Sequence, residues 1–91
     1  MHFILYSRSY CHLCQDMLDA LLALRTPARP FTVDVIDVDA DPALVARFDE
    51  LVPVLFAGEE QMCHYFLDTP KVLAALGGVG KPANSQPIAT Q

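Results

Sequence analysis

Two cysteines three residues apart, Cys11 and Cys14, carry the most distinctive chemistry of this sequence, in the run Tyr10-Cys11-His12-Leu13-Cys14. On the first turn of a helix, this spacing puts both sulfur atoms on one side, close enough to form a disulfide. A helix N-terminus carries partial positive charge and unpaired N–H groups, and both stabilise a thiolate. A free thiol titrates near pH ~8.5, and such a position lowers its pKa by about one to several units.

The two positions predict different roles in a thiol–disulfide redox pair. Cys11 comes first, at the exposed end of the helix, so its thiolate is expected to attack. Cys14 lies one turn inside and is expected to be the less accessible, resolving thiol. The catalytic residues predicted from the sequence are therefore Cys11 and Cys14.

A metal-ligand pair or two inert thiols are the alternatives for these cysteines. A zinc site needs about four ligands, and Cys63 with His64 or His12 would have to complete it. Three cysteines, an odd number, do not suit a disulfide-stapled extracellular scaffold. In a reducing cytosol, a close pair is more often catalytic or metal-binding than structural. Redox chemistry is favoured, and neither a metal site nor a bound cofactor is predicted.

Three further side chains each leave two interpretations open. Tyr10 either lies at the rim and shields the disulfide or stacks on a ligand. His12 is either an exposed polar residue or an imidazolium that lowers the pKa of Cys11. Cys63 is either a small hydrophobe in an edge strand or a third redox thiol.

The hydrophobic pattern predicts the elements that position these residues. An apolar run from His2 to Tyr6 indicates a buried strand. A helix is expected from about Cys11 to about Leu24, with one broad apolar face and Ser9 as its N-cap. The alternation from Phe31 to Val38 predicts a second strand, and the acidic residues in and after it are assigned to its exterior and to a helix cap.

The second half of the chain predicts two helices around a hairpin. Asp41 as N-cap and Pro42 at the first position begin a short helix that runs to about Phe48. Strands at 54–57 and 61–65 form the hairpin, and 68–70 begin a last helix that ends at 77–78. The order β-α-β-α-β-β-α predicts a four-stranded mixed sheet with the three helices on both faces.

Composition limits the classes of function. The chain has 91 residues, of which 53% are hydrophobic, so one folded domain is expected. A formal charge of −5 argues against nucleic acid as a partner. The longest apolar runs are too short to cross a bilayer, and the first residues lack the features of a signal peptide. We expect a cytoplasmic monomer that does not bind membranes.

A strand, a Cys-x-x-Cys pair opening a helix, a β-α unit, and a Val52-Pro53 step into a hairpin and closing helix together resemble the thioredoxin superfamily. The short length is similar to its glutaredoxin branch, and within it to small glutaredoxin-like proteins with a Cys-His-Leu-Cys type centre. This resemblance covers roughly residues 2 to 76. It implies a thioredoxin-like α/β fold, with a glutaredoxin-like domain at 1–76 and a flexible tail at 77–91.

The resemblance also implies roles for residues around the cysteines. Pro53 stands where the superfamily has a cis-proline that faces the redox pair, and the backbone of Val52 would pair with the bound thiol substrate. Arg8 matches the position of a lysine in many glutaredoxins, where it would hold a glutathione carboxylate and favour the Cys11 thiolate. The implied substrate-binding set is Arg8, Tyr10, His12, Val52 and Pro53.

Two departures from the glutaredoxin pattern concern the substrate. Glutaredoxins usually have Pro-Tyr between the cysteines, where this chain has His12-Leu13. Their Gly-Gly-x-x-Asp stretch, which binds glutathione, is replaced by residues 63–68 without a glycine pair, and Asp68 would serve only in part. The expected function is a thiol–disulfide oxidoreductase with glutathione or a protein disulfide as partner. The alternative is a non-catalytic thioredoxin-fold module that binds a metal or partner protein or senses oxidation.

Overall fold

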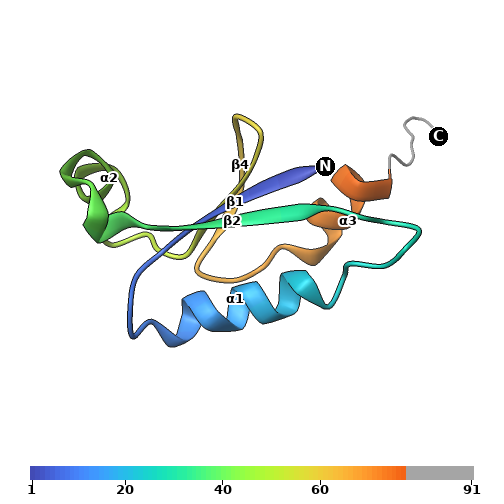
Figure 1. The fold of residues 1–91 in the computed structure, drawn as a ribbon, viewed down its shortest axis with the longest axis horizontal. Coiled ribbons are helices and arrows are strands. Elements are labelled where there is room, and N and C mark those ends of the chain that lie inside the picture. The colour runs from blue at the N-terminus through green and yellow to red at the C-terminus, as the bar shows by residue number, and fades with distance from the viewer. Residues whose placement is uncertain (78–91) are drawn as a thin grey trace.

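One mixed β-sheet with helices on both faces organises the chain, and the computed structural model describes residues 1–77 of it (Figure 1). In chain order, the elements are strand β1 (His2–Ser7), helix α1 (His12–Leu22), strand β2 (Thr32–Asp37), the 3-10 helix η1 (Val38–Ala40), helix α2 (Pro42–Phe48), strands β3 (Val54–Ala57) and β4 (Glu60–His64), and helix α3 (Thr69–Gly77). The predicted β-α-β-α-β-β-α order is confirmed, with η1 added to it. Most of the expected tail, from residue 78 on, lies outside the described residues.

The strands lie in the order β2-β1-β3-β4. β1 pairs in parallel with β2 and antiparallel with β3, and the β3–β4 hairpin is antiparallel. Leu5 at the centre of β1 therefore lies beside Val35 on one side and Leu55 on the other. The predicted four-stranded mixed sheet is confirmed, and β1 lies inside it with its end next to the cysteines.

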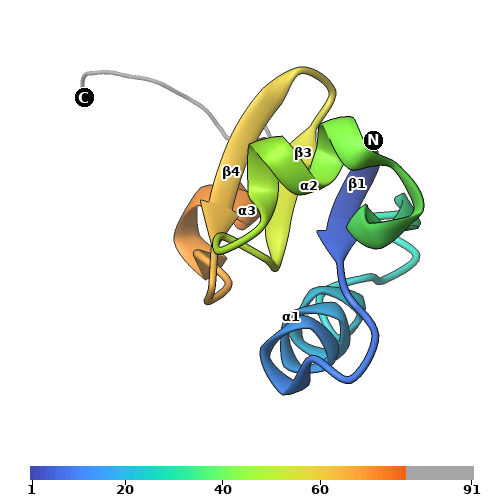
Figure 2. The same ribbon diagram turned by 90° about the vertical axis from the view of Figure 1, so that its left-hand side faces the viewer.

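Successive residues of β1 point to opposite faces of the sheet and into two separate apolar cores. Phe3 and Leu5 are fully buried in a core that α1 and α3 complete. Ile4 and Tyr6 pack on the other face, where α2 contributes Phe48 (Figure 2). Helix α1 is held against the sheet by its buried side chains, which are Cys14, Met17 and Leu21.

Capping residues fix where the helices begin. The side chain of Asp41 accepts a hydrogen bond from the backbone N–H of Ala43 at 2.9 Å, and Pro42 follows it, as predicted. Asp68 caps α3 by accepting from the N–H of Lys71 at 3.1 Å. η1 was not predicted; the Asp37 carboxylate, 2.9 Å from the N–H of Asp39, stabilises this turn directly after β2.

No helix in the described range 1–77 is long and apolar enough to cross a membrane.

Replacing Phe48 with alanine should test the core beneath α2. Its side chain is 3% exposed, stacks on Tyr6 with 4.6 Å between ring centroids, and meets Phe56 edge-on. We expect Phe48→Ala to lower the free energy of unfolding by about 3–5 kcal/mol, because it leaves a cavity. Urea unfolding measures this loss. Phe66→Ala, at a side chain 71% exposed, is the control and should change it by less than about 0.5 kcal/mol. Equal losses would contradict this packing.

Candidate active site

Cys11 and Cys14 form a disulfide at the N-terminal end of α1, with 5.2 Å between their Cα atoms. Cys11 is the N-cap, with extended backbone angles (φ −109°, ψ 107°), and Cys14 lies in the first helical turn. Buried apolar residues of α1 hold this turn against the sheet, so both sulfur atoms have defined positions near the C-terminal end of β1.

The sulfur of Cys11 caps the helix. Its Sγ accepts a hydrogen bond from the backbone N–H of Cys14 at 3.1 Å. The prediction that Ser9 is the N-cap is therefore wrong, because the helix begins two residues later and the sulfur occupies the place of a capping oxygen. A thiolate at this position accepts the same N–H bond with a full charge, which strengthens the bond.

The two cysteines differ in their access to solvent. Cys14 is 4% exposed and packs beneath the turn, whereas Cys11 is only half-buried. A substrate sulfur can therefore approach Cys11, and Cys14 is positioned behind it. This difference agrees with the separate roles expected from the order of the two residues.

A cleft of about 460 Å³ opens beside the disulfide. Its lining comes from β1 and β2, the loop between β1 and α1, and the first turns of α1. The lining residues are Leu5, Ser7, Arg8, Ser9, Tyr10, Cys11, His12, Cys14, Gln15, Leu18 and Val35. The structure thus brings three of the predicted substrate-binding residues, Arg8, Tyr10 and His12, to the cysteines.

Tyr10 makes the sharp turn from β1 toward α1. Its φ is +59°, in the left-handed region that residues other than glycine rarely adopt. Its side chain is fully exposed and packs against nothing. Tyr10 lies at the rim of the cleft, as expected, but its fully exposed ring does not cover the disulfide in this structure. Stacking on a ligand stays a prediction, and an unpartnered ring beside the cleft is free to do so.

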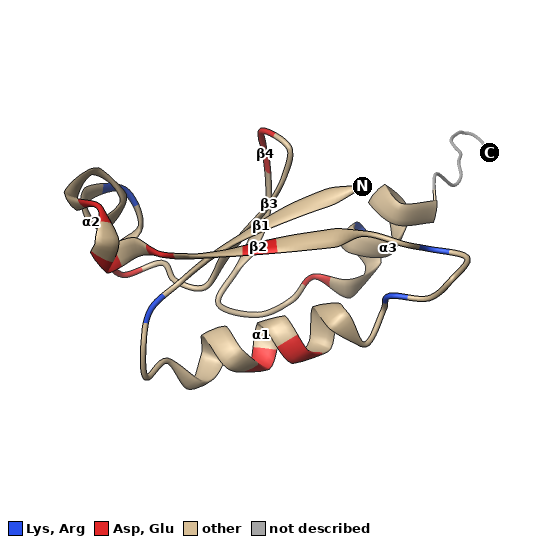
Figure 3. Cartoon of the chain, in the orientation of Figure 1, with Lys and Arg blue, Asp and Glu red and all other residues tan. Residues whose placement is uncertain are grey.

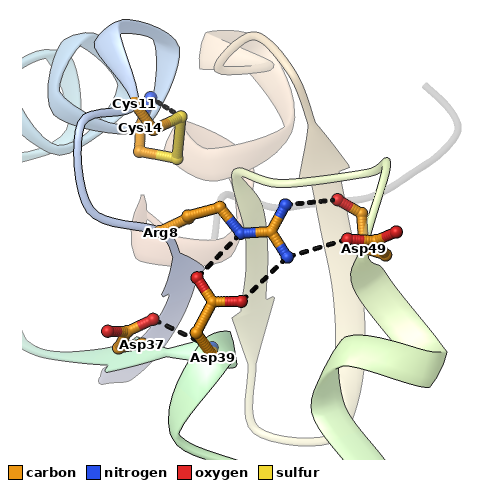
Figure 4. A network of polar contacts seen from close by, with 6 residues as sticks. All are labelled: Arg8, Cys11, Cys14, Asp37, Asp39 and Asp49. Atoms are coloured by element: carbon orange, nitrogen blue, oxygen red, sulfur yellow. Dashed lines mark hydrogen bonds and ion pairs between the residues drawn. A yellow bond between two sulfur atoms is a disulfide. The ribbon is translucent and has the colours of Figure 1, made fainter. Parts of the chain in front are cut away.

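Arg8, directly after β1, is engaged by two carboxylates (Figure 4). Its Nε and Nη2 donate to both carboxylate oxygens of Asp39, at 3.0 and 3.1 Å. Nη2 also donates to the Asp49 carboxylate at 2.8 Å, and Nη1 donates to the Asp49 carbonyl at 3.2 Å. Hydrogen bonds with Asp49 and then Asp39 raise the pKa of Arg8 above its usual value. Arg8 was predicted to bind a substrate carboxylate, but its guanidinium already donates hydrogen bonds to Asp39 and Asp49.

Arg8 lies in acidic surroundings. The segment 37–50 holds five carboxylates and one arginine. Figure 3 marks acidic positions in red at and next to α2. Asp39 is itself oriented by its N–H bond to Asp37 (Figure 4). Two carboxylates face one guanidinium, so this group of charges is net negative at neutral pH.

Val52 and Pro53 are joined by a cis peptide bond, as the resemblance implied. Pro53 is buried at the start of β3, and its carbonyl accepts a hydrogen bond from the N–H of Tyr65 at 2.9 Å. Neither Val52 nor Pro53 lines the cleft. Their contact with a substrate stays a prediction. It would occur on the β3 side of β1, opposite β2.

Tyr65 lies in the segment 63–68, which corresponds to the Gly-Gly-x-x-Asp stretch of glutaredoxins but has no glycine. Its φ is +64°, and its hydroxyl donates to the Glu50 carbonyl at 2.6 Å. The Tyr65 side chain thus ties the turn after β4 to the loop that follows α2, and it does so without glycine.

Cys63 lies on β4, half-buried and free of any disulfide. Burial raises the pKa of its thiol, and a backbone hydrogen bond at Asp68 partly opposes this effect. Among residues 1–77, no group of three or more His, Cys, Asp or Glu side chains is placed to hold a metal ion.

Sequence reasoning missed Asp39, Asp49 and Val35. The two aspartates lie 31 and 41 positions from Arg8, so no local spacing connects them with it. Val35 was assigned to a strand, but the alternation does not tell which strand residues a helix leaves uncovered. A pair of carboxylates flanking the turn after β2 was the available signal for Asp39, and it was assigned to strand exterior and capping.

Comparison with known proteins adds to this geometry. The sequence profile of the family described as Glrx-like, Glutaredoxin-like domain (DUF836), matches residues 2–77. The chain belongs to this glutaredoxin-like family. No curated protein matches the chain significantly.

Three solved structures are similar to this glutaredoxin-like chain. The structural genomics target protein XcR50 from X. campestris has 29% identity and a TM-score of 0.66, over 86% of this chain and 99% of that one. The glutaredoxin-like protein NrdH-redoxin from Escherichia coli has 27% identity and a TM-score of 0.58, over 80% and 95%. Wheat glutaredoxin, at 19% identity and a TM-score of 0.50 over 82% and 72%, shares the fold. The chain is a thioredoxin-fold redox protein.

The raised pKa of Cys63 makes a prediction about alkylation. Less of a thiol with a raised pKa is thiolate near neutral pH, and the thiolate is the form that reacts. In a Cys11→Ser, Cys14→Ser double variant, the rate of Cys63 alkylation by iodoacetamide should rise with pH with a midpoint above that of N-acetylcysteine amide, which has no free carboxylate. Mass spectrometry of the modified peptide measures the rate. A midpoint at or below that of N-acetylcysteine amide would contradict the burial of this thiol.

Proposed function

We propose that this protein is a thiol–disulfide oxidoreductase, in which the Cys11 thiolate attacks a disulfide and Cys14 resolves the product. Attack forms a mixed disulfide between Cys11 and one substrate sulfur, and the other substrate sulfur leaves as a thiolate. Cys14 then attacks the sulfur of Cys11 and releases the second substrate thiol. Two electrons pass to the substrate, the Cys11–Cys14 disulfide remains, and a separate thiol reductant returns the electrons.

The hydrogen bond from the Cys14 N–H to the Cys11 sulfur carries this proposal. It connects the nucleophile to the positive end of an eleven-residue helix, where a negative charge on sulfur is stabilised. The burial of Cys14 behind a more accessible Cys11 supports the order of the two steps. Membership of the glutaredoxin-like family and the similarity to NrdH-redoxin support the same chemistry.

A protein disulfide is the proposed substrate, in preference to glutathione. A guanidinium has five N–H donors, and Asp39 and Asp49 use four of those of Arg8. Too few donors remain for two-point binding of a glutathione carboxylate, and the group of charges is net negative. The similar NrdH-redoxin is described as a glutaredoxin-like protein with a thioredoxin-like activity profile, which agrees with this preference.

Serine variants of the cysteines test the proposed reaction. We expect Cys11→Ser to reduce insulin disulfides, with dithiothreitol as reductant, no faster than dithiothreitol alone, because the attacking sulfur is gone. Cys14→Ser should accumulate a mixed disulfide between Cys11 and the substrate, because nothing resolves it. A turbidity assay and non-reducing mass spectrometry measure the two outcomes.

Cys63→Ser is the matched control for these variants. It removes a thiol outside the cleft and should keep the wild-type rate. Full activity in Cys11→Ser would overturn the proposed role of Cys11. A wild-type protein that reduces insulin no faster than dithiothreitol alone would favour a module whose cysteines only sense oxidation.

Releasing Arg8 from its carboxylates tests the substrate preference. In an Asp39→Asn, Asp49→Asn double variant the guanidinium loses both ionic partners, so we expect a several-fold lower KM for a glutathione mixed disulfide. Adding Arg8→Ala should reverse this gain. Bis(2-hydroxyethyl) disulfide, which is uncharged, should show no such change, and steady-state kinetics measures both substrates.

The control for this charge change is Glu59→Gln with Glu60→Gln, which removes two carboxylates at the β3–β4 turn, outside the cleft lining. It should leave the KM for the glutathione mixed disulfide near the wild-type value. An equal decrease in both double variants would mean that overall charge, and not the release of Arg8, governs the KM.

A further inference from the structure

Val35 is an apolar side chain that the fold leaves uncovered beside the redox pair. It is 51% exposed, although its neighbour across the sheet, Leu5, is fully buried. Two residues earlier on the same face of β2, Val33 packs against the core that α1 completes. Helix α1 therefore covers β2 at Val33 but not at Val35. The uncovered position lies toward the N-terminal end of α1, where the cysteines are.

The uncovered Val35 lies in the cleft that contains the cysteines. The cleft has an apolar floor formed by Leu5, Leu18 and Val35. Cys11 and Cys14 line the same space. A group that fills this cleft therefore lies next to the sulfur atoms. In the proposed reaction, it would belong to the molecule that presents its disulfide to Cys11.

The charges around the cleft indicate an uncharged occupant. No acidic side chain lines it, and its one permanent cation is Arg8, which Asp39 and Asp49 neutralise. A charged group placed against these apolar side chains would lose hydration, and the lining offers neutral hydrogen-bonding groups in return but no unpaired, permanently charged side chain. The chemistry of the lining thus suits an apolar side chain.

The position of β2 indicates that the occupant belongs to a polypeptide. β2 is at one edge of the sheet, and in residues 1–77 no further strand pairs with its outer side. An extended segment can use the backbone groups of such an edge while its side chains enter an adjacent pocket. A small disulfide would leave this edge unused.

We propose that the cleft is a subsite for an apolar side chain of the protein substrate, close in sequence to its disulfide cysteine, and that Val35 determines this specificity. The inference rests on the proposed oxidoreductase function and names the feature by which substrates are recognised. It places the apolar contact on the β2 side of the cysteine turn, away from Val52 and Pro53.

Two neutral peptide disulfides test the subsite. They are the disulfide-linked dimers of acetylated, amidated Gly-Cys-Leu-Gly and Gly-Cys-Gly-Gly, with bis(2-hydroxyethyl) disulfide as the reference substrate. We expect the wild-type protein to have a lower KM for the leucine peptide. Val35→Thr keeps the branched shape and the strand preference of valine while it adds a hydroxyl. It should raise the KM for the leucine peptide by about tenfold and leave the other two substrates unchanged.

Phe66→Ser is the matched control, because it removes an exposed apolar side chain outside the cleft. It should keep the preference for the leucine peptide. If Phe66→Ser removes the preference, or Val35→Thr keeps it, the subsite is not on the β2 side and the inference is overturned. If the wild-type protein reduces none of the three disulfides, the proposed function fails as well.

A second readout does not depend on turnover. In Cys14→Ser, the mixed disulfide between Cys11 and the leucine peptide should shift the methyl resonances of Val35 in a carbon-13 NMR spectrum. The glycine peptide should shift them much less. Equal small shifts with both peptides would overturn the inference, even if the kinetics showed a preference.

Discussion

The hydrogen bond between the backbone N–H of Cys14 and the sulfur of Cys11 is the interaction on which the site depends. It makes the sulfur of Cys11 the cap of a helix, so the same contact that begins α1 would also stabilise negative charge on the proposed nucleophile. Cys14, Met17 and Leu21 bury one face of α1 against the sheet, and this packing holds the donor N–H of Cys14 in place. Packing of the core thus fixes where the sulfur lies.

A second constraint acts on the loop that carries Cys11. Arg8 connects the end of β1 to Asp39 after β2 and to Asp49 after α2. These three segments are distant in sequence, and one planar guanidinium holds them with four hydrogen bonds. The loop begins at this held residue, and two residues later it turns at Tyr10 with a positive φ before it reaches Cys11.

The fold and the redox pair could be predicted from the sequence because local patterns encode both. Alternation marked the strands, Asp41-Pro42 marked the start of α2, and the cysteine spacing marked the redox turn. The partners of Arg8 could not be predicted, since they come from residues 31 and 41 positions away. The N-cap was misassigned to Ser9 because hydroxyls are the usual caps, whereas here the cap is a sulfur.

In the proposed function, the pairing of Arg8 with two carboxylates accounts for a preference between related substrates. The resemblance to glutaredoxins implies a cation that faces the substrate at this position, and the chain supplies the cation. Two carboxylates of the acidic segment 37–50 then form ion pairs with this cation, so its charge holds the loop in place. With that charge neutralised, the cleft beside Cys11 presents Val35 and Leu18 among uncharged groups. Such a surface gains most from burying apolar area, and protein segments offer more of it than a small anionic thiol does.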